Sequence, residues 1–164
     1  MKYSVLLLCL SAFHWGISQQ KLAKLLKKEN RSDIPYIRVD SLKSIVNNVH
    51  LLDAREYAEF KTSHIKNALP VGYSKFNIDS LAPKIPNKKD TIVVYCSLGI
   101  RSGHIAKKLK RAGYSNVLNL YGGIFEWKNN SLEVVNNSNQ YTDTIHAFSK
   151  AWGKWLRKGI KVYE

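Results

Sequence analysis

The sequence predicts an α/β fold, in which a mostly parallel β-sheet carries helices on both faces. Thr91–Tyr95 is an apolar, β-branched run typical of a buried strand, and Asn116–Leu120 is a second strand. Between them, Ile105, Ala106 and Leu109 recur at helical spacing. Strands that alternate with helices are typical of parallel sheets, because a parallel pair needs a crossover connection. The length of 164 residues is sufficient for one domain with a hydrophobic core.

The other elements follow in order along the chain. A short amphipathic helix is predicted over residues 21–30, followed by a strand over residues 34–39 that Pro35 weakens at its start. Asp40 or Ser41 then caps a short helix. The later segments are a strand at 49–52, a helical turn at 56–61, a strand near 68–69, a helical turn at 79–82, and a helix that ends at Arg111 before Gly113. Gly122-Gly123 then makes a turn into residues 124–128.

Three segments stand directly after predicted strands. Asp53 follows the strand at 49–52, Cys96 follows the next, and Gly122-Gly123 follows the last. The ligand site of a parallel sheet lies at the carboxyl ends of its strands. These residues are therefore predicted to gather at one edge of the sheet.

Cys96 stands at the turn from a strand into the N-terminus of a helix. Gly99 lies in the short loop between them, and Arg101 adds a fixed positive charge. Unpaired N–H groups and the positive end of the helix dipole favour an anion at this place. A thiolate, a persulfide and a bound oxyanion are all anions, so Cys96 is the candidate nucleophile.

The first residues have the pattern of a secretory signal. Lys2 precedes an apolar run at residues 5–13 that is too short to span a bilayer, and small residues at 16–18 suit cleavage after Ser18. We expect a signal peptide at residues 1–18, an N-terminal helix and linker at 19–33, a domain at 34–130 and an extension at 131–164. Cleavage would remove Cys9 and leave Cys96 as the single thiol of an exported protein, periplasmic or secreted. A short uncleaved anchor is the alternative.

The chain is strongly basic, with a formal net charge of +14 from 26 Lys and Arg against 12 Asp and Glu. A charge excess by itself favours solubility and non-specific association, so a solvated basic surface is the first interpretation. Attraction of small anionic substrates and contact with an anionic membrane surface are the alternatives. Nucleic acid binding is not predicted, because no binding motif or basic stripe with interleaved aromatic residues is present. No metal-ligand spacing is found, and no cofactor is implied.

The extension is predicted to contain an appended C-terminal amphipathic helix after an asparagine-rich loop at 136–142. Asp143 or Thr144 can cap it, and apolar residues recur at helical spacing from Ile145 through Trp152 to Leu156. The first interpretation is a helix that packs its tryptophans on the domain. The alternative is a helix that binds a membrane surface or a partner, since lysines flank the aromatic stripe.

Three stretches resemble the signatures of the rhodanese-like superfamily. They are residues 51–60 with 63–68, residues 94–102 around Cys96, and residues 121–127. The resemblance runs from about Ile37 to Lys128, and the three stretches occur in the family's order and at domain spacing. The resemblance implies a rhodanese-like three-layer fold and a small, exported, single-domain sulfurtransferase.

In that family a cysteine takes a sulfane sulfur from a donor such as thiosulfate, becomes a persulfide and passes the sulfur to cyanide or a thiol. The resemblance makes Cys96 the nucleophile and implies a small anionic sulfur donor as partner, with a thiol protein acceptor as a further one. It also implies that Asp53 and Arg55 form an ion pair that supports the loop. Arg101 would bind the donor's charge and favour the thiolate. The residues implied in substrate binding are Ser97, Leu98, Gly99, Ile100 and Arg101, with Ser102 as a supporting residue.

Two other functions compete with sulfur transfer. Cysteine phosphatases place a longer loop between cysteine and arginine, and the shorter gap from Ser97 to Ile100 suits a persulfide sulfur better than a phosphate. A persulfide carrier, or a redox or protein-interaction module without small-molecule turnover, is the second alternative. The intact Cys96 argues against an inactive domain. His64 and Trp127 are interpreted as structural residues.

Overall fold

The structure is a computed structural model that describes residues 20–29 and 34–163. The chain divides into two units, Met1–Arg31 and Ser32–Glu164. The first unit contributes a helix over residues 20–29, in agreement with the helix predicted at 21–30. The predicted signal segment, with Cys9, lies outside the described residues. Within the described ranges, no helix combines the length and apolar character that a bilayer crossing requires.

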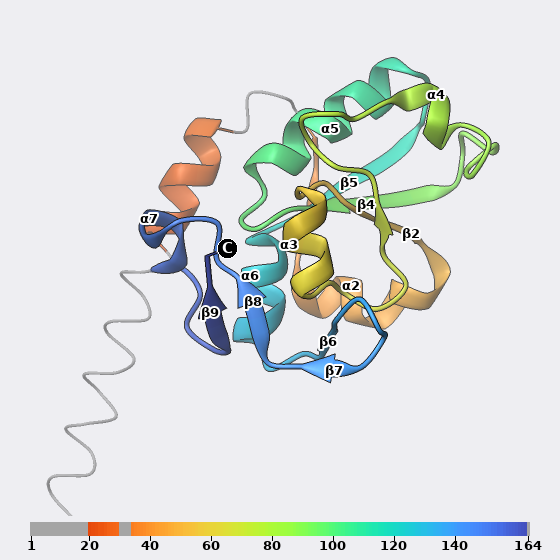
Figure 1. Ribbon diagram of the computed structural model, residues 1–164. Coiled ribbons are helices and arrows are strands. Elements are labelled where there is room, and N and C mark those ends of the chain that lie inside the picture. The colour runs from red at the N-terminus through yellow and green to blue at the C-terminus, as the bar shows by residue number, and fades with distance from the viewer. Residues whose placement is uncertain (1–19, 30–33, 164) are drawn as a thin grey trace, which may run out of the picture. The chain divides into compact units, whose positions relative to one another are not determined.

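A parallel sheet forms the centre of the second unit (Figure 1). Its strands are β1 (Tyr36–Ile37), β2 (His50–Asp53), β3 (Leu69–Pro70), β4 (Thr91–Tyr95) and β5 (Asn116–Leu120). They lie in the order β1-β5-β4-β2-β3, and every neighbouring pair is parallel. The predicted fold class is therefore confirmed, and β4 and β5 begin and end at the predicted residues.

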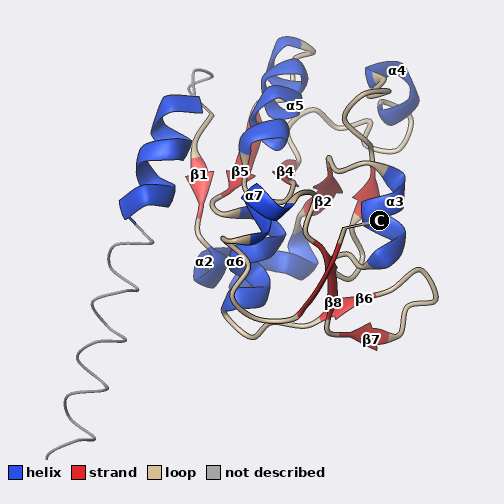
Figure 2. Ribbon diagram, turned by 60° about the vertical axis from the view of Figure 1, so that its left-hand side comes forward, coloured by secondary structure: helices blue, strands red, loops and turns tan. Residues whose placement is uncertain are grey.

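Helices cover both faces of this sheet, with α4 and α5 on one side and α2 and α6 on the other (Figure 2). The capping prediction for α2 is wrong, because the residue before its first turn is Arg38 and no side chain caps it. The elements are α2 (Val39–Ile45), η1 (Val46–Asn48), α3 (Tyr57–Thr62), α4 (Ile78–Leu81), α5 (Ile100–Arg111) and α6 (Gly123–Asn129).

One hydrophobic core lies between the sheet and α5. Alternate strand residues face α5, because side chains of a strand point in turn to opposite faces of the sheet. The helix contributes one apolar stripe at the spacing that the sequence shows. The main members of this core are Leu52, Ile92, Val94 and Val117 from the strands and Ile105, Ala106 and Leu109 from α5. This packing fixes the start of α5, and with it the loop that contains the cysteine.

The extension differs from the prediction. The asparagine-rich segment is a loop over residues 136–140, as predicted, and its last two residues form β7 (Tyr141–Thr142), which pairs with β6 (Val134–Val135) in a hairpin. The long amphipathic helix is wrong: β8 (Thr144–His146) pairs in parallel with β9 (Ile160–Val162), and the helix between them, α7 (Lys150–Gly153), has four residues. We call residues 144–163 the C-terminal strap.

Glycine explains why the strap does not continue as a helix. α7 ends at Gly153, where an added Cβ would lie 2.8 Å from Tyr163 Oη, and Gly159 adopts a positive φ of 99°. Ser149 caps α7 by accepting a hydrogen bond from the Trp152 amide, so the helix begins later than Asp143 or Thr144 would allow. The strap is thus a compact turn-rich segment and not a detachable helix.

His64 predicts how the stability of the fold depends on pH. Its ring stacks on Phe60 at a centroid distance of 3.8 Å, its Nδ1 lies 3.0 Å from the Phe60 carbonyl oxygen, and burial lowers its pKa below the ordinary 6.5. Below pH 6.5 the His64 side chain therefore binds a proton more readily in the unfolded chain than in the folded chain. The His64 contribution to the free energy of unfolding is thus complete above pH 6.5 and is lost as the pH falls below it. We expect urea denaturation to show a lower free energy of unfolding at about pH 5.5 than at about pH 7.5.

The test variant is His64→Gln, and the control variant is His104→Gln, because His104 is an exposed histidine. His64→Gln should flatten the dependence between these pH values, whereas His104→Gln should leave it unchanged. An unaltered slope in His64→Gln would contradict the assignment to His64.

Candidate active site

The chain after β4 folds around the sulfur of Cys96. Gly99 has a positive φ of 113°, which a residue with a side chain rarely adopts, and it stands directly before the first residue of α5. This turn directs the Gly99 N–H at Cys96 Sγ, at a distance of 3.1 Å. The sulfur therefore lies at the N-terminus of a twelve-residue helix and accepts a backbone hydrogen bond there. Both features favour negative charge on the sulfur.

Two polar side chains hold the loop against β5. Asn119 Nδ2 donates to the Gly99 carbonyl oxygen at 2.8 Å, and Asn119 Oδ1 accepts from Ser102 Oγ at 2.7 Å. The same hydroxyl oxygen lies 3.5 Å from Cys96 Sγ. The side chains of Asn119 and Ser102 are fully buried, so water does not compete for these bonds. Ser102 therefore lies beside the sulfur, and its supporting role stays a prediction.

The third predicted segment meets the loop through its backbone. The Ile124 N–H donates to the Cys96 carbonyl oxygen at 2.9 Å. Gly123 approaches so closely that an added Cβ would lie 2.2 Å from that oxygen and 2.7 Å from the Ser97 carbonyl carbon. A side chain at position 123 is therefore excluded by the loop. The strand ends that carry Asp53, Cys96 and Gly123 are neighbours, as predicted.

Arg101 points away from solvent and pairs with Glu59 of α3. Its Nη1 and Nη2 donate to Glu59 Oε2 and Oε1 at 2.7 and 2.8 Å, and both side chains are more than nine-tenths buried. Ser97 Oγ joins this pair, 3.0 Å from Arg101 Nη2 and 3.2 Å from Glu59 Oε1. Burial raises the pKa of Glu59, but the hydrogen bonds and charge of Arg101 outweigh it and leave the pKa below its ordinary value. The pair is therefore charged, and binding of a donor anion by these nitrogens would require it to open.

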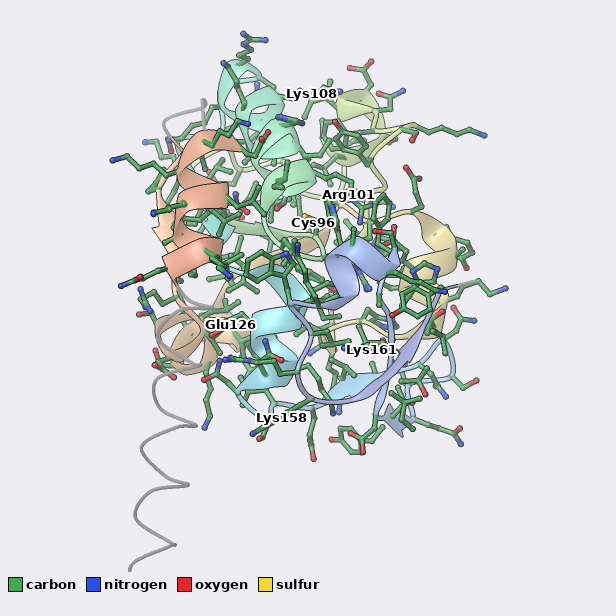
Figure 3. The ribbon with its side chains drawn as sticks, turned by 90° about the vertical axis from the view of Figure 1, so that its left-hand side faces the viewer. Cys96, Arg101, Lys108, Glu126, Lys158 and Lys161 are labelled. Carbon is green, nitrogen blue, oxygen red and sulfur yellow. The ribbon has the colours of Figure 1, made fainter. Side chains whose placement is uncertain are left out.

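The C-terminal strap covers the same arginine. The Phe148 ring lies 4.6 Å from Arg101 Cζ, and the Trp152 ring lies 5.9 Å from it. Figure 3 shows Cys96 and Arg101 beside each other, close to the blue helix of the strap. An aromatic face attracts a guanidinium through its quadrupole, so these contacts stabilise Arg101 where it stands.

The ion pair predicted between Asp53 and Arg55 is present. Arg55 Nη2 donates to Asp53 Oδ2 at 2.6 Å and to the Ser63 carbonyl oxygen at 2.6 Å, and both charged side chains are fully buried. The guanidinium also lies 5.8 Å from the Tyr95 ring centroid. This pair ties the end of β2 to the segment after α3. Its role in supporting the loop stays a prediction. Trp127 is buried and donates to the Glu133 carbonyl oxygen, which is a structural role.

Tyr36 adds a hydroxyl group near the loop. It pairs in register with Asn119 on the neighbouring strand, and its ring meets the Tyr121 ring edge-on at 5.5 Å. Burial, followed by the electrostatic influence of Cys96 and Tyr121, raises the pKa of Tyr36 to about 12. Tyr36 therefore stays protonated at neutral pH and remains a hydrogen-bond donor.

The sequence patterns assign no role to Glu59, Asn119 or Tyr36, and they place Phe148 only in the apolar stripe of the predicted C-terminal helix. Asn119 carried a usable signal, because an asparagine inside a largely apolar strand is unusual in a buried position. Glu59 also carried one, since it lies in a predicted helical turn inside a family signature. Tyr36 and Phe148 carried none, because their positions depend on strand pairing and on the fold of the strap.

The fold and the site together define an α/β domain with a buried cysteine at the N-terminus of a helix. The rhodanese-like domain family matches residues 38–130. The chain therefore belongs to the rhodanese-like family, whose members include sulfurtransferases and sulfur carriers.

Individual relatives agree with this membership. The chain is 36% identical to a sulfurtransferase of Allochromatium vinosum over 54% of its own length and 79% of that protein. It is 31% identical to the putative sulfur carrier protein YrkF of Bacillus subtilis, over 60% of this chain and 54% of YrkF. Among solved structures, a rhodanese-related protein from Thermoplasma volcanium superposes with a TM-score of 0.54 at 25% identity, over 62% of this chain and 97% of that one. The chain thus spans about half the length of YrkF, and the strap lies beyond the family match.

Proposed function

We propose that this protein is a sulfurtransferase that moves a sulfane sulfur from thiosulfate or a similar donor, through a persulfide on Cys96, to a thiol or cyanide acceptor. The observation that supports this best is the Gly99 N–H directed at Cys96 Sγ from the start of α5. A persulfide is a small anion, and backbone N–H groups at a helix N-terminus can stabilise its charge.

The reaction is balanced without an oxidant. The Cys96 thiolate attacks the outer sulfur of thiosulfate, a new sulfur–sulfur bond forms, the bond inside thiosulfate breaks, and sulfite leaves with the electron pair. In the second half, cyanide or an acceptor thiolate attacks the outer sulfur of the persulfide, and the Cys96 thiolate leaves. The Gly99 N–H and the helix dipole stabilise the anion that is present at the site in both halves.

Burial of the cysteine suits the intermediate between the two halves. Cys96 is fully buried, and in the described part of the chain it is the only free cysteine. An exposed persulfide would react with any passing thiol or oxidant. We infer that the loop shields the sulfur until an acceptor enters, which requires local opening of the site.

The direct test is the intact mass of the protein after incubation with thiosulfate. We expect a gain of one sulfur atom, located by peptide mapping to the peptide that contains Cys96, and its removal by cyanide with release of thiocyanate. Absence of the added sulfur with thiosulfate, polysulfide and a low-molecular-weight persulfide would overturn the proposal.

The same experiment separates the enzyme from a persulfide carrier, which the similarity to YrkF makes the second candidate. A carrier would gain the sulfur but would turn over slowly with cyanide and with small thiols. Multiple turnovers per cysteine with either acceptor support the sulfurtransferase.

We further propose that the protein is exported after removal of residues 1–18. The support is the sequence pattern at its start, which resembles a signal peptide. The test is the N-terminal mass of the protein recovered from the periplasmic and extracellular fractions of producing cells. Recovery of the uncleaved chain from the cytoplasm alone would overturn this proposal.

A further inference from the structure

The C-terminal strap lies outside the family match at residues 38–130, yet it reaches the active site. It is anchored independently of that contact. Asn129 Nδ2 donates to the Trp155 carbonyl oxygen at 3.0 Å, and Asn129 Oδ1 accepts from the amides of Arg157 and Lys158 at 2.7 and 3.3 Å. Lys128, which is also buried, pairs with Asp143 just before the strap. The strap is therefore a fixed part of this unit.

The anchored strap holds Phe148 in an unfavourable backbone conformation. Phe148 has a φ of +64°, in the left-handed region that bulky side chains rarely adopt. Its N–H donates to His146 Nδ1 at 3.1 Å, and the next amide, of Ser149, donates to the Ala147 carbonyl oxygen at 2.7 Å. A glycine or asparagine would suit this tight turn better. The benzyl group is thus a poor choice for the backbone, which points to a role for the ring itself.

The Phe148 ring lies over the Arg101 guanidinium. Glu59 occupies Nη1 and Nη2, and Phe148 and Trp152 lie over the guanidinium. Arg101 Nε has no hydrogen-bond partner within the described part of the chain, but it is buried and so is not reached from solvent. An anionic donor therefore cannot use Arg101 as a charged partner while the strap is in place.

Phe148 offers the leaving group of a donor an aromatic contact instead of a charged one. Phe148 is 43% exposed, and its ring forms a tilted pair with the Trp152 ring at a centroid distance of 4.6 Å. The face of an aromatic ring carries partial negative charge, so it repels sulfonate oxygens but favours another aromatic or an apolar group. A donor whose leaving group ends in an organic ring gains contact area here, whereas one that ends in an oxyanion does not.

We propose that Phe148 is a specificity-determining residue that directs this site toward donors with an organic leaving group, such as aryl thiosulfonates and organic persulfides, and away from thiosulfate. This inference rests on the proposed sulfurtransferase function. With an aryl thiosulfonate, the Cys96 thiolate takes the outer sulfur as a persulfide, and the aryl sulfinate leaves with the electron pair. The half-reaction is the same as with thiosulfate except for the group that departs.

The test compares benzenethiosulfonate with thiosulfate, using the full chain and cyanide as the common acceptor. We expect the wild type to prefer benzenethiosulfonate in kcat/KM by about tenfold or more, a ratio that one aromatic contact supplies. Phe148→Ala should raise the KM for benzenethiosulfonate about tenfold with kcat nearly unchanged, while the KM for thiosulfate stays equal or falls. Phe148→Tyr keeps the ring and should keep the preference.

Tyr141→Ala is the matched control, since Tyr141 is an exposed aromatic residue beside a cation, Lys66, on the β7 hairpin. It should leave the donor ratio unchanged. An equal loss for both donors in Phe148→Ala, or an unchanged ratio, overturns the inference while the sulfurtransferase function stands. If the wild type accepts sulfur from neither donor, this inference is wrong, and the proposed function is then decided by the separate test with polysulfide and a low-molecular-weight persulfide.

Discussion

Cys96→Ser is expected to abolish sulfur transfer while leaving the fold intact. A hydroxyl group is a far weaker nucleophile than a thiolate and does not form a persulfide, so turnover with thiosulfate and cyanide should fall by at least about a thousandfold. The serine oxygen is smaller than sulfur but accepts the same hydrogen bond from the Gly99 N–H, which lies 3.1 Å from Sγ in the native protein. The thermal midpoint should therefore change by only a few degrees.

The measurements are steady-state turnover, intact mass after exposure to the donor, and thermal unfolding. Ser102→Ala is the matched control, because its hydroxyl oxygen lies 3.5 Å from Sγ but forms no covalent bond in the reaction. It should lower turnover only in part and should still gain a sulfur atom. Residual turnover of Cys96→Ser near the wild-type rate would show that the cysteine is not the nucleophile.

Glu59→Gln is expected to be the most destabilising of the single substitutions at the site. It leaves the Arg101 charge buried without a counter-charge, and breaking a buried pair from one side costs about 3–5 kcal/mol. The side chains of Arg101 and Glu59 are 8% and 4% exposed, so water offers little compensation. Because Ser97 Oγ bonds both partners, the loop beside the cysteine should loosen and turnover should fall as well.

Urea denaturation measures the first effect, with Glu133→Gln as control, since Glu133 is an exposed glutamate. That control should stay within about 0.5 kcal/mol of the wild type. The double variant Glu59→Gln with Arg101→Gln should lose less than the sum of the two single variants, because it removes both charges together. Additive losses would show that the two side chains do not stabilise each other.

Local signals in the sequence were enough to predict the central strands of the sheet and the cysteine that follows one of them. Thr91–Tyr95 and Asn116–Leu120 are strands at the predicted residues, because buried parallel strands read as short apolar runs whatever surrounds them. The ion pair between Asp53 and Arg55 could also be expected, because the family resemblance implies it and the two residues are only two positions apart.

The parts that sequence analysis missed depend on contacts between distant residues. Glu59 and Arg101 are 42 positions apart, and no local pattern links a carboxylate on α3 to a guanidinium on α5. The apolar residues of the strap fit a helical period and therefore predict a helix. Its actual structure depends on the pairing of β8 with β9 and on the glycines at 153 and 159. A count of apolar residues at helical spacing takes neither into account.

The close approach of Gly123 to the backbone of Cys96 and Ser97 has a consequence for engineering. The backbone of the loop at residues 96–102 packs directly on Gly123, which has no side chain and belongs to the turn between β5 and α6. Grafting residues 96–102 alone onto another scaffold would therefore transfer the cysteine without the glycine backbone that packs against its loop. A faithful transplant must carry the two turns as one piece, together with the asparagine of β5 that bonds the Gly99 carbonyl oxygen.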